Sequence, residues 1–371
     1  MKILYGVQGT GNGHITRTRM MAKHFAQRDD VEVTYLFSGR GKDSYFDMAV
    51  FGDYLCRQGL TFYVDSGKLN YLRTLRHNNF VAFVREMRAL QLQLDQFDLV
   101  ITDFEPITAW AARLGKKKLL GLGHQYAFAY NIPREGENFI SRLLMRNFAP
   151  ANSAFGLHWD SFGGLILPPI VDPDLTRRAG ALHREAEKII VYLPFENQQL
   201  VTDLLQQIPH YRFFQYSAEL TDSQVSNVSL RKTCHEGFVN DLCSSRAVLC
   251  NAGFELVSEA IQLGLDILVK PLQGQPEQLS NAAALVELQL GRRLDQLTPQ
   301  GVSDWLSSLT GSGHTPAPSP YPDVAKSLVH WIIDPDKCQA ETLAKRLWSE
   351  YRNSVPGETV GSQAEPREAH C

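Results

Sequence analysis

A histidine and an aspartate in this sequence each follow a short apolar run and have the side chains needed for proton transfer. His14 ends the segment GTGNGH, and Asp103 ends the apolar run in FDLVITDFEP. Imidazole is suited to take a proton near neutral pH, and a buried carboxylate beside it fixes its tautomer and stabilises the imidazolium. We therefore take His14 as a candidate general base and Asp103 as its candidate partner.

Both residues also have a purely structural interpretation. His14 stands at the first turn of a predicted helix, where it could cap that helix or simply pack. Asp103 could cap the helix that begins near Pro106, because aspartate is a common N-cap residue. The sequence alone does not decide between catalysis and structure for either residue.

The glycines of the opening loop indicate that an anion or a substrate approaches the backbone there. Gly11 and Gly13 leave backbone N–H groups free at the positive end of a helix. The dinucleotide fingerprint G-x-G-x-x-G would begin at Gly9 but needs glycine or alanine where His14 stands, and the Gly-Lys-Ser/Thr of a Walker loop is absent. Gly11 and Gly13 are candidate donor-binding positions that match neither phosphate-loop pattern.

A second polar group lies in AVLCNAGFELVSEAIQLGLDILVKPLQGQPEQLSNAAALVE. A predicted strand ends at Asn251, and a turn containing Gly253 leads into a helix with free amide groups at its start. Such a strand–glycine–helix unit can bind a pyrophosphate through the helix dipole and N–H donors. Glu259 follows on that helix, and a later polar loop carries Glu277 and Gln278.

Strands that alternate with helices position these residues. In the first half, the predicted strands are Lys2–Gln8, Val31–Ser38, Leu60–Asp65, Asp98–Asp103 and Lys118–Gly123. In the second half, they are Lys188–Leu193, Arg212–Tyr216, Ala247–Asn251 and Asp266–Lys270. The alternation predicts an α/β fold with two doubly wound, Rossmann-like parallel-sheet domains that face each other across a cleft.

The length of 371 residues is that of two ordinary domains. Composition and turn residues divide the chain into six parts. These are a first domain (1–168), a linker (169–187), a second domain (188–310), a flexible loop (311–322), C-terminal helices (323–352) and a disordered tail (353–371).

The composition is that of an ordinary globular protein without a polyanionic partner. The formal net charge is -3, which gives no indication of nucleic acid binding. The six cysteines form no CxxC pair and no metal-ligand spacing, so we expect reduced thiols and a cytoplasmic protein. No run approaches the roughly 20 apolar residues of a membrane span, although Lys116, Lys117 and Lys118 leave peripheral contact with anionic lipid open.

The C-terminal motif resembles the nucleotide-sugar site of two-domain glycosyltransferases with the GT-B fold. The likeness is greatest to the peptidoglycan lipid II N-acetylglucosaminyltransferase (MurG-like) and to plant and antibiotic UDP-glycosyltransferases. The motif residues are Gly253, Glu259, Pro271, Glu277, Gln278, Asn281 and Ala282. The Gly-Asn-Gly-His of the opening loop is also similar to that family's Gly-Gly-His loop. The resemblance spans both predicted domains.

The resemblance assigns roles to the donor-side residues. Glu259 would bind the ribose hydroxyls of the donor, while Glu277 and Gln278 would contact its sugar. The backbone amides of Gly253, Phe254 and Glu255 would hold its diphosphate.

The resemblance also predicts the position of the base. The segment EGFVNDLCSSRAVLC is similar to the loop that recognises the base, which places Phe238 under a uracil ring. The plant enzymes have histidine at the position of Asn251 and a tryptophan under the uracil that has no clear counterpart here.

The leading hypothesis is an inverting glycosyltransferase that moves a sugar from a nucleoside diphosphate, with UDP as the expected carrier, to a hydroxyl acceptor. His14 would act as the base and Asp103 as its partner, without metal or cofactor, because a helix amino terminus stabilises the leaving diphosphate. The acceptor is not identified; a lipid-linked molecule and a glycan both fit.

Three further functions stay open. One is a nucleotide-sugar epimerase of the same fold. Another is an NADPH-dependent oxidoreductase, in which Arg40 would meet a 2′-phosphate. The third is a non-catalytic sugar-nucleotide sensor.

Overall fold

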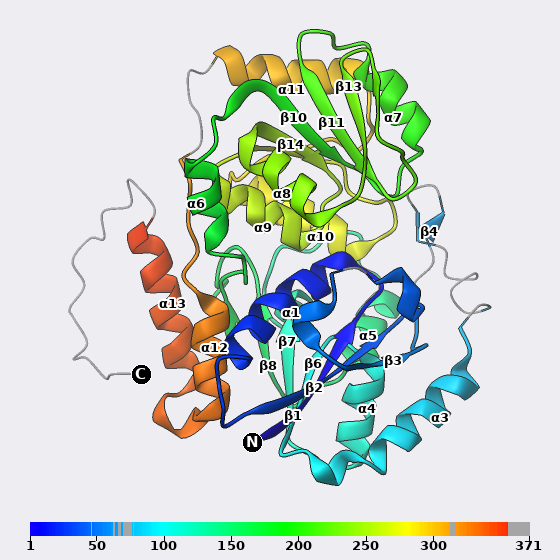
Figure 1. Ribbon diagram of the computed structural model, residues 1–371, viewed down its shortest axis with the longest axis vertical. Helices are drawn as coiled ribbons and strands as arrows, with labels where there is room; N and C mark the ends of the chain where they lie inside the picture. Colours follow the sequence, from blue (N-terminus) through cyan, green and yellow to red (C-terminus); the bar gives the residue numbers. More distant parts are fainter. Residues whose placement is uncertain are drawn as a thin grey trace.

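The computed structural model describes residues 1–45, 47–61, 64–65, 68–69, 76, 78–311 and 317–354. These residues form two α/β domains that lie one above the other along the long axis of the molecule (Figure 1). Within them, each domain has one seven-stranded sheet. The expected fold class, two doubly wound α/β domains, is therefore confirmed.

The sheet of the first domain is parallel throughout. Its spatial order is β3-β2-β1-β6-β7-β8-β9. The bounds are β1 (Lys2–Gln8), β2 (Glu32–Ser38), β3 (Tyr54–Arg57), β6 (Leu99–Asp103), β7 (Leu119–Gly123), β8 (Ser153–Leu157) and β9 (Ile166–Leu167). The strand order reverses between β1 and β6. In open α/β sheets, ligands bind beyond the carboxyl ends of the strands at such a switch point.

The third strand of this sheet differs from the prediction. It is Tyr54–Arg57, which precedes the predicted Leu60–Asp65. Gly59 has φ of 59°, and this left-handed residue turns the chain out of the sheet before the predicted run begins. Within that run, Phe62 and Tyr63 lie outside the described residues, while β4 (Val64–Asp65) pairs with β5 (Lys68–Leu69) in a separate hairpin.

Helices cover both faces of the first sheet. They are α1 (Asn12–Phe25), α3 (Phe80–Gln91), α4 (Pro106–Leu114) and α5 (Phe139–Phe148), with short 3-10 turns at Lys42–Ser44, Ala49–Phe51, Leu94–Gln96 and His124–Ala129. Alternate residues of β1 face opposite sides, as a strand requires. Tyr5 packs in the cluster that contains α1, and Leu4 packs in the cluster that contains α3 and α4.

The sheet of the second domain repeats this plan with one antiparallel edge strand. The spatial order is β12-β13-β11-β10-β14-β15-β16, and β12 pairs antiparallel with β13. The bounds are β10 (Glu185–Tyr192), β11 (Arg212–Ser217), β12 (Ser223–Val225), β13 (Val228–Lys232), β14 (Ser245–Cys250), β15 (Asp266–Val269) and β16 (Arg292–Arg293). The strand order reverses between β10 and β14, which places a second switch point at the loop that follows β14.

The helices of the second domain include one in the predicted linker. They are α6 (Asp174–Gly180), α7 (Gln198–Leu205), α8 (His235–Ser244), α9 (Phe254–Leu263), α10 (Pro276–Glu287) and α11 (Pro299–Gly311). The predicted linker 169–187 contains α6, which packs on α8 and α9, and it overlaps β10 from Glu185 onward. Much of this segment is therefore part of the second domain.

After the second domain, the chain returns to the first. Helix α12 (Val324–Ile333) packs on α1, and α13 (Ala340–Ser354) follows a 3-10 turn at Pro335–Lys337. Trp348 Nε1 of α13 donates to the backbone oxygen of Ile166, 2.7 Å away. Residues 312–316 of the predicted loop and 355–371 of the predicted tail lie outside the described residues. No helix in the described ranges is long and apolar enough to cross a bilayer.

The two connections between the domains meet at one side chain of α9. Gln262 is buried; its Nε2 donates to the backbone oxygen of Asp172 at 2.8 Å, and its Oε1 accepts from the backbone N–H of Tyr321 at 3.4 Å. Asp172 lies on the outgoing connection and Tyr321 on the returning one. The connections therefore lie side by side, both held by the second domain.

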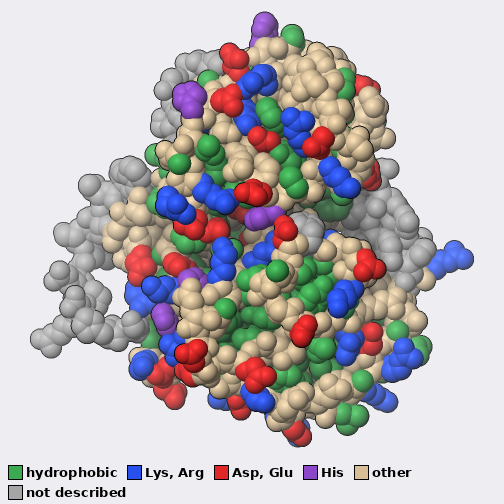
Figure 2. All heavy atoms as spheres, in the orientation of Figure 1, with side chains coloured by type: hydrophobic (Ala, Val, Ile, Leu, Met, Phe, Trp, Pro, Cys, Tyr) green, Lys and Arg blue, Asp and Glu red, His purple; other side chains and the backbone are tan. Residues whose placement is uncertain are grey.

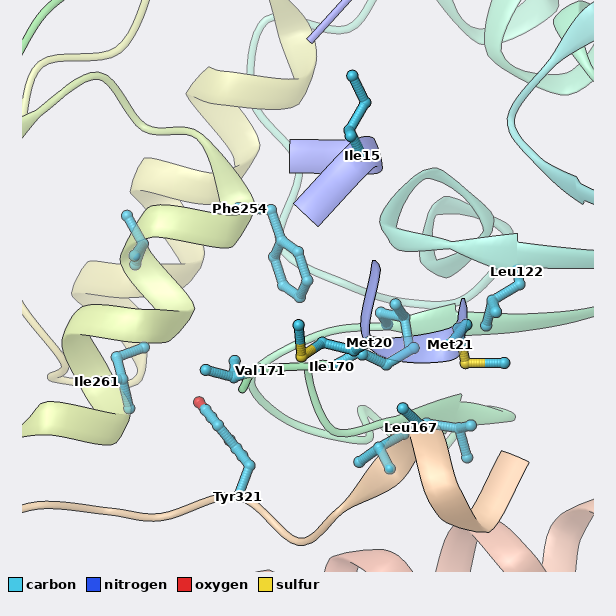
Figure 3. Close-up of a cluster of buried hydrophobic side chains, with 14 of the residues drawn as sticks. Ile15, Met20, Met21, Leu122, Leu167, Ile170, Val171, Phe254, Ile261 and Tyr321 are labelled. Atoms are coloured by element: carbon cyan, nitrogen blue, oxygen red, sulfur yellow. The ribbon is translucent and has the colours of Figure 1, made fainter. Parts of the chain in front are cut away.

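An apolar cluster joins the two domains. Figure 3 shows Met20 of α1 and Leu167 of β9 with Phe254 and Ile261 of α9, together with Ile170 from the connection between the domains. These residues are buried. The surfaces of the two domains therefore pack as one continuous core, which fixes α1 relative to α9.

Candidate active site

The first sheet places His14 and Asp103 side by side at its switch point. His14 lies in the first turn of α1, and Asp103 is the last residue of the neighbouring β6. The distance from His14 Nδ1 to Asp103 Oδ1 is 2.8 Å. The Asp103 side chain is fully buried, while 14% of the histidine side chain is exposed. The structure thus joins the two residues selected from the sequence.

Glu105, not Asp103, caps the helix that begins at Pro106. Glu105 is buried, and its carboxylate accepts from the backbone N–H groups of Ile107 at 2.9 Å and Thr108 at 2.6 Å. Phe104 has φ of 53°, so the chain turns sharply between the two acids. This turn lets Glu105 cap α4 while Asp103 faces His14.

Two groups of opposite hydrogen-bonding character face Nδ1 of His14: Asp103 Oδ1 lies 2.8 Å away and Arg17 Nη2 lies 3.0 Å away. An ionised carboxylate only accepts hydrogen bonds and a guanidinium only donates them, so Asp103 favours a proton on Nδ1 and Arg17 opposes it. We take the tautomer with the proton on Nδ1, donated to Asp103, as the catalytic one. The lone pair of the neutral imidazole is then on Nε2. This is the arrangement that a histidine base requires when a carboxylate orients it.

Arg17 is the site residue that the sequence analysis missed. It lies one helical turn after His14 and is almost fully buried. Its Nε donates to Asp103 Oδ2 at 2.9 Å and its Nη2 donates to Oδ1. Burial opposes ionisation of Asp103, but Arg17 and His14 outweigh burial and hold the pKa of Asp103 below its ordinary value. The spacing of three residues from His14 on one helix is the signal that could have revealed Arg17.

Arg17 also links the two domains. Its Nη1 donates to Oε1 of Glu255, a residue in the first turn of α9. Burial raises the pKa of Glu255 to about 7, although Arg17 opposes that shift. The family resemblance implies ligand binding only for the backbone amide of Glu255, and the structure adds a side chain that reaches the catalytic candidates of the other domain.

The contact between Glu255 and α1 explains Gly13. A Cβ on Gly13 would lie 2.6 Å from Cγ of Glu255, too close for two carbon atoms, whereas a Cβ on Gly11 would have its nearest neighbour, His14 Cδ2, at 3.9 Å. The structure therefore gives Gly13 a role in close packing of the domains.

We predict that Gly13→Ala forces Glu255 away from Arg17 and lowers the unfolding free energy by roughly 1–3 kcal/mol, the usual cost of overpacking. Gly11→Ala is the matched control on the same loop and should have a much smaller effect. Thermal unfolding of both variants measures the difference. Equal loss of stability in the two would contradict this role of Gly13.

The loop after β14 places the start of α9 against the first domain. Gly253 is the N-cap of α9, its N–H donates to the Asn251 oxygen at 2.8 Å, and no side chain caps the helix. Asn251 is buried, and its Nδ2 donates to the Lys270 oxygen at 2.9 Å. The Gly253 N–H and the Asn251 Nδ2 are thus already engaged within the protein, whereas Asn251 Oδ1 is buried without a partner among the described residues. The amides of Phe254 and Glu255 lie in the uncapped first turn.

Phe254 contributes its ring to the junction between the domains. The ring is buried and stacks on His124 of the first domain, with centroids 4.1 Å apart and ring planes 6° apart. His124 Nε2 lies 2.7 Å from Oδ1 of Asn281 on α10. The side chain of Phe254 therefore holds the domains together, whatever its amide binds.

Glu259 lies one turn beyond Glu255 on α9. Burial, followed by the charges of Glu255 and Asp172, raises its pKa to about 8. No hydrogen-bond partner of its side chain is found among the described residues. An acid that is partly buried without a partner has the properties of a group that awaits a ligand.

Glu277 and Gln278 both lie in the first turn of α10 but have different surroundings. Glu277 Oε1 accepts from Gln125 Nε2 of the first domain at 3.2 Å. Gln278 is buried, and its Oε1 accepts from the backbone N–H of Leu272 at 3.0 Å, so it fixes the loop that leads to α10. The structure places Glu277 at the junction between the domains and Gln278 beneath the loop.

Phe238 lies on a helix, which differs from the expected loop. It is part of α8 and its ring meets Tyr192 and Tyr216 edge-on, with centroids 5.5 and 5.1 Å away. The segment forms a helix because Val239, Leu242 and Cys243 recur on one buried face. Phe238 is only half-buried, so its side chain remains accessible beside the junction.

Charged side chains of both signs gather along the boundary between the domains on the face shown in Figure 2. In the described parts of the chain, no three His, Cys, Asp or Glu side chains are arranged to hold a metal ion. Metal independence of the reaction remains a prediction.

The fold, with polar residues at both switch points, is that of the two-domain GT-B class of glycosyltransferases. Residues 1–310 match the sequence model of the family described as "Glycosyl transferase family 1". The match covers most of the chain, and this protein therefore belongs to glycosyl transferase family 1. No curated protein sequence matches the chain significantly.

Solved structures support the fold assignment. Arabidopsis thaliana UGT89C1, complexed with quercetin, has a TM-score of 0.60 at 13% identity, over 94% of this chain and 98% of that one. Phytolacca americana UGT2, complexed with UDP-2fluoro-glucose and pterostilbene, has a TM-score of 0.57 at 13% identity, over 94% and 98%. Acinetobacter baumannii MurG has a TM-score of 0.53 at 14% identity, over 83% and 90%. At these identities the likeness concerns the fold.

Proposed function

We propose that this family member is an inverting glycosyltransferase that moves a sugar from a nucleoside diphosphate, with UDP as the carrier, to a hydroxyl acceptor. One observation carries the proposal. The His14–Asp103 pair of the first domain lies opposite the uncapped start of α9 in the second, and Arg17 contacts both Asp103 and Glu255. A proton acceptor thus lies close to a helix end that favours negative charge.

In the proposed reaction, Nε2 of His14 takes the proton of the acceptor hydroxyl. The acceptor oxygen forms a bond to the anomeric carbon while the bond from that carbon to the diphosphate breaks. Asp103 stabilises the resulting imidazolium, and negative charge builds on the leaving diphosphate. The amides of Phe254 and Glu255 stabilise that charge, so the step needs no metal in this proposal.

The remaining donor contacts follow the family resemblance. The Glu259 carboxylate accepts hydrogen bonds from the ribose hydroxyls. Its lack of a hydrogen-bond partner among the described residues supports this role. Glu277 contacts the sugar from the junction between the domains. Gln278 does so only if its Nε2, which has no hydrogen-bond partner among the described residues, turns toward the donor. Phe238 lies under the base, which its half-buried ring on α8 supports.

A thermal-shift panel of nucleotide sugars and NADPH tests the donor assignment. We expect a UDP-sugar to raise the melting temperature, because a ligand that binds only the folded state stabilises it. Glu259→Ala should remove most of this shift. Stabilisation by NADPH with no response to any nucleotide sugar would instead favour an oxidoreductase.

Turnover assays distinguish sugar transfer from epimerisation and from sensing. An epimerase would change a UDP-sugar without a second substrate, which nuclear magnetic resonance detects. A sensor would bind the donor and never consume it. Membership in a glycosyltransferase family supports transfer over both.

We place the reaction in the cytoplasm, with peripheral contact to a membrane. The described cysteines are free thiols, which fits a reducing compartment.

Helix α5 exposes 74% of Phe139 and 52% of Leu143 next to the exposed Arg142, a combination suited to an anionic lipid surface. Running the transfer assay with and without anionic vesicles tests this point, and equal rates and no sedimentation with vesicles would argue against it.

A further inference from the structure

A cavity of about 830 Å³ opens in the first domain beyond the carboxyl ends of β2 and β3. Its wall includes Arg40 after β2, Arg57 at the end of β3, and Arg85 and Glu86 of α3. The cavity lining contains three arginines and one glutamate. A cavity of this size is large enough for a sugar-sized ligand.

None of the three arginines has a carboxylate partner within the described residues. Arg40 Nη2 donates to Asn12 Oδ1 at 2.9 Å, while its Nε is buried without a hydrogen-bond partner. Arg57 Nη1 donates to the backbone oxygen of Cys56 at 3.0 Å. Arg85 is exposed and has no partner in the described ranges.

Glu86 forms no ion pair with these arginines among the described residues, and three arginines against one glutamate leave the lining a formal charge of +2. Its two carboxylate oxygens accept from the backbone N–H groups of Gln58 and Gly59, each at 3.4 Å, and so fix the loop after β3. Burial lowers the pKa of Arg40, and its guanidinium lies over the Tyr45 ring, 4.7 Å from the ring centroid. An anion in the cavity would supply the missing hydrogen-bond acceptors.

The cavity adjoins the loop that carries His14. Arg40 contacts Asn12, two residues before His14, and Gly9 N–H donates to the Ser38 oxygen at 2.7 Å. Gly39, on the cavity wall, touches the same loop, since a Cβ on it would lie 2.5 Å from Cγ2 of Thr10. A ligand in the cavity would therefore approach the His14 loop from the acceptor-side domain.

We propose that this cavity binds an oxyanion group, a phosphate or a carboxylate, on the acceptor, and that Arg57 and Arg85 contribute its hydrogen-bond donors together with Arg40. This inference rests on the proposed function, because it identifies the class of acceptor. Arginine pairs with both kinds of oxyanion in a bidentate way. The acceptor is then an anionic molecule whose hydroxyl reaches His14 while its charged group lies in the cavity.

Isothermal titration of the full chain with glucose 6-phosphate, glucuronate and glucose tests the inference without any nucleotide. We expect at least one of the anionic probes to bind about 10-fold more tightly than glucose, and the tighter of the two identifies the oxyanion. Arg85→Gln should weaken this binding by roughly 10-fold, the loss expected for one charge-assisted hydrogen bond.

Arg88→Gln is the matched control, because Arg88 lies on the same helix one turn further on, is exposed and does not line the cavity. It should leave the affinity within about twofold of the wild type, given the small effect of surface charges. Arg57→Gln, at the end of β3, is a second cavity variant and should also weaken the binding. Melting temperatures of all variants confirm that they are folded.

Three results would overturn the inference. They are equal affinity for glucose and both anionic probes, equal effects of Arg85→Gln and Arg88→Gln, and tight NADPH binding that Arg85→Gln weakens. The thermal-shift panel of nucleotide sugars tests the proposed function independently of these titrations. If anion binding depends on Arg85 but no UDP-sugar binds, the anion site stands and the transferase proposal falls.

Discussion

Replacing His14 with alanine lowers sugar transfer by about 100-fold or more and leaves donor affinity nearly unchanged, if His14 is the general base. The reason is geometric. In the tautomer in which Nδ1 donates to Asp103, with 2.8 Å between Nδ1 and Oδ1, Nε2 is the nitrogen left to take the acceptor's proton. Initial rates and UDP titrations of the same preparation measure the two quantities separately.

His210→Ala controls for the loss of an imidazole elsewhere, since His210 is exposed in the second domain. It should keep the wild-type rate. Wild-type turnover in His14→Ala would sink the base assignment. A large loss of donor affinity in His14→Ala, with kcat kept, would show instead that His14 binds the donor.

Replacing Arg17 with methionine should produce the largest loss of stability. Arg17 is the shared partner of Asp103 and Glu255, and its removal leaves Asp103 buried with only His14 to offset its charge. Removing one member of a buried ion pair typically costs about 3–5 kcal/mol. Urea unfolding monitored by circular dichroism measures the change.

Glu255→Gln is the informative comparison because it keeps a hydrogen-bond acceptor for Arg17 while removing one charge. Its cost should be smaller, since burial raises the pKa of Glu255 to about 7, so that the carboxyl group is only partly ionised at neutral pH. The double variant should be less destabilised than the sum of the two single variants, because the two residues are in contact. An Arg17→Met protein as stable as the wild type would contradict the account.

The sequence was sufficient to predict the His14–Asp103 contact but not its third member. The neighbouring strands β1 and β6 are parallel, so their carboxyl ends meet at the same edge of the sheet. His14 follows β1 and Asp103 ends β6, so the topology alone brings them to that edge. Arg17 has a sequence signal only in its spacing from His14. Its contact with Glu255 joins residues 238 positions apart, and it depends on how two complete domains pack.

Local turn geometry explains the other differences. Aspartate is the better N-cap in general, yet Glu105 caps α4 because Phe104 adopts a left-handed conformation and reverses the direction of the next side chain. Likewise, the left-handed Gly59 turns the chain out of the sheet after Tyr54–Arg57, so the third strand precedes the run from Leu60, although that run has residues typical of a strand. In both places a single backbone conformation outweighs the preference of the residue types.

The packing of Gln262 determines how the molecule can open. The side-chain amide of Gln262 bonds to both connections between the domains, at Asp172 and Tyr321. Gln262 lies on α9, the helix whose first turn carries Glu255. If the two domains move apart, we expect both connections to stay with α9 and the second domain. Separating the domains would break the contact between Glu255 and Arg17. Opening the molecule would therefore also disconnect the second domain from the arginine that holds Asp103, the partner of His14.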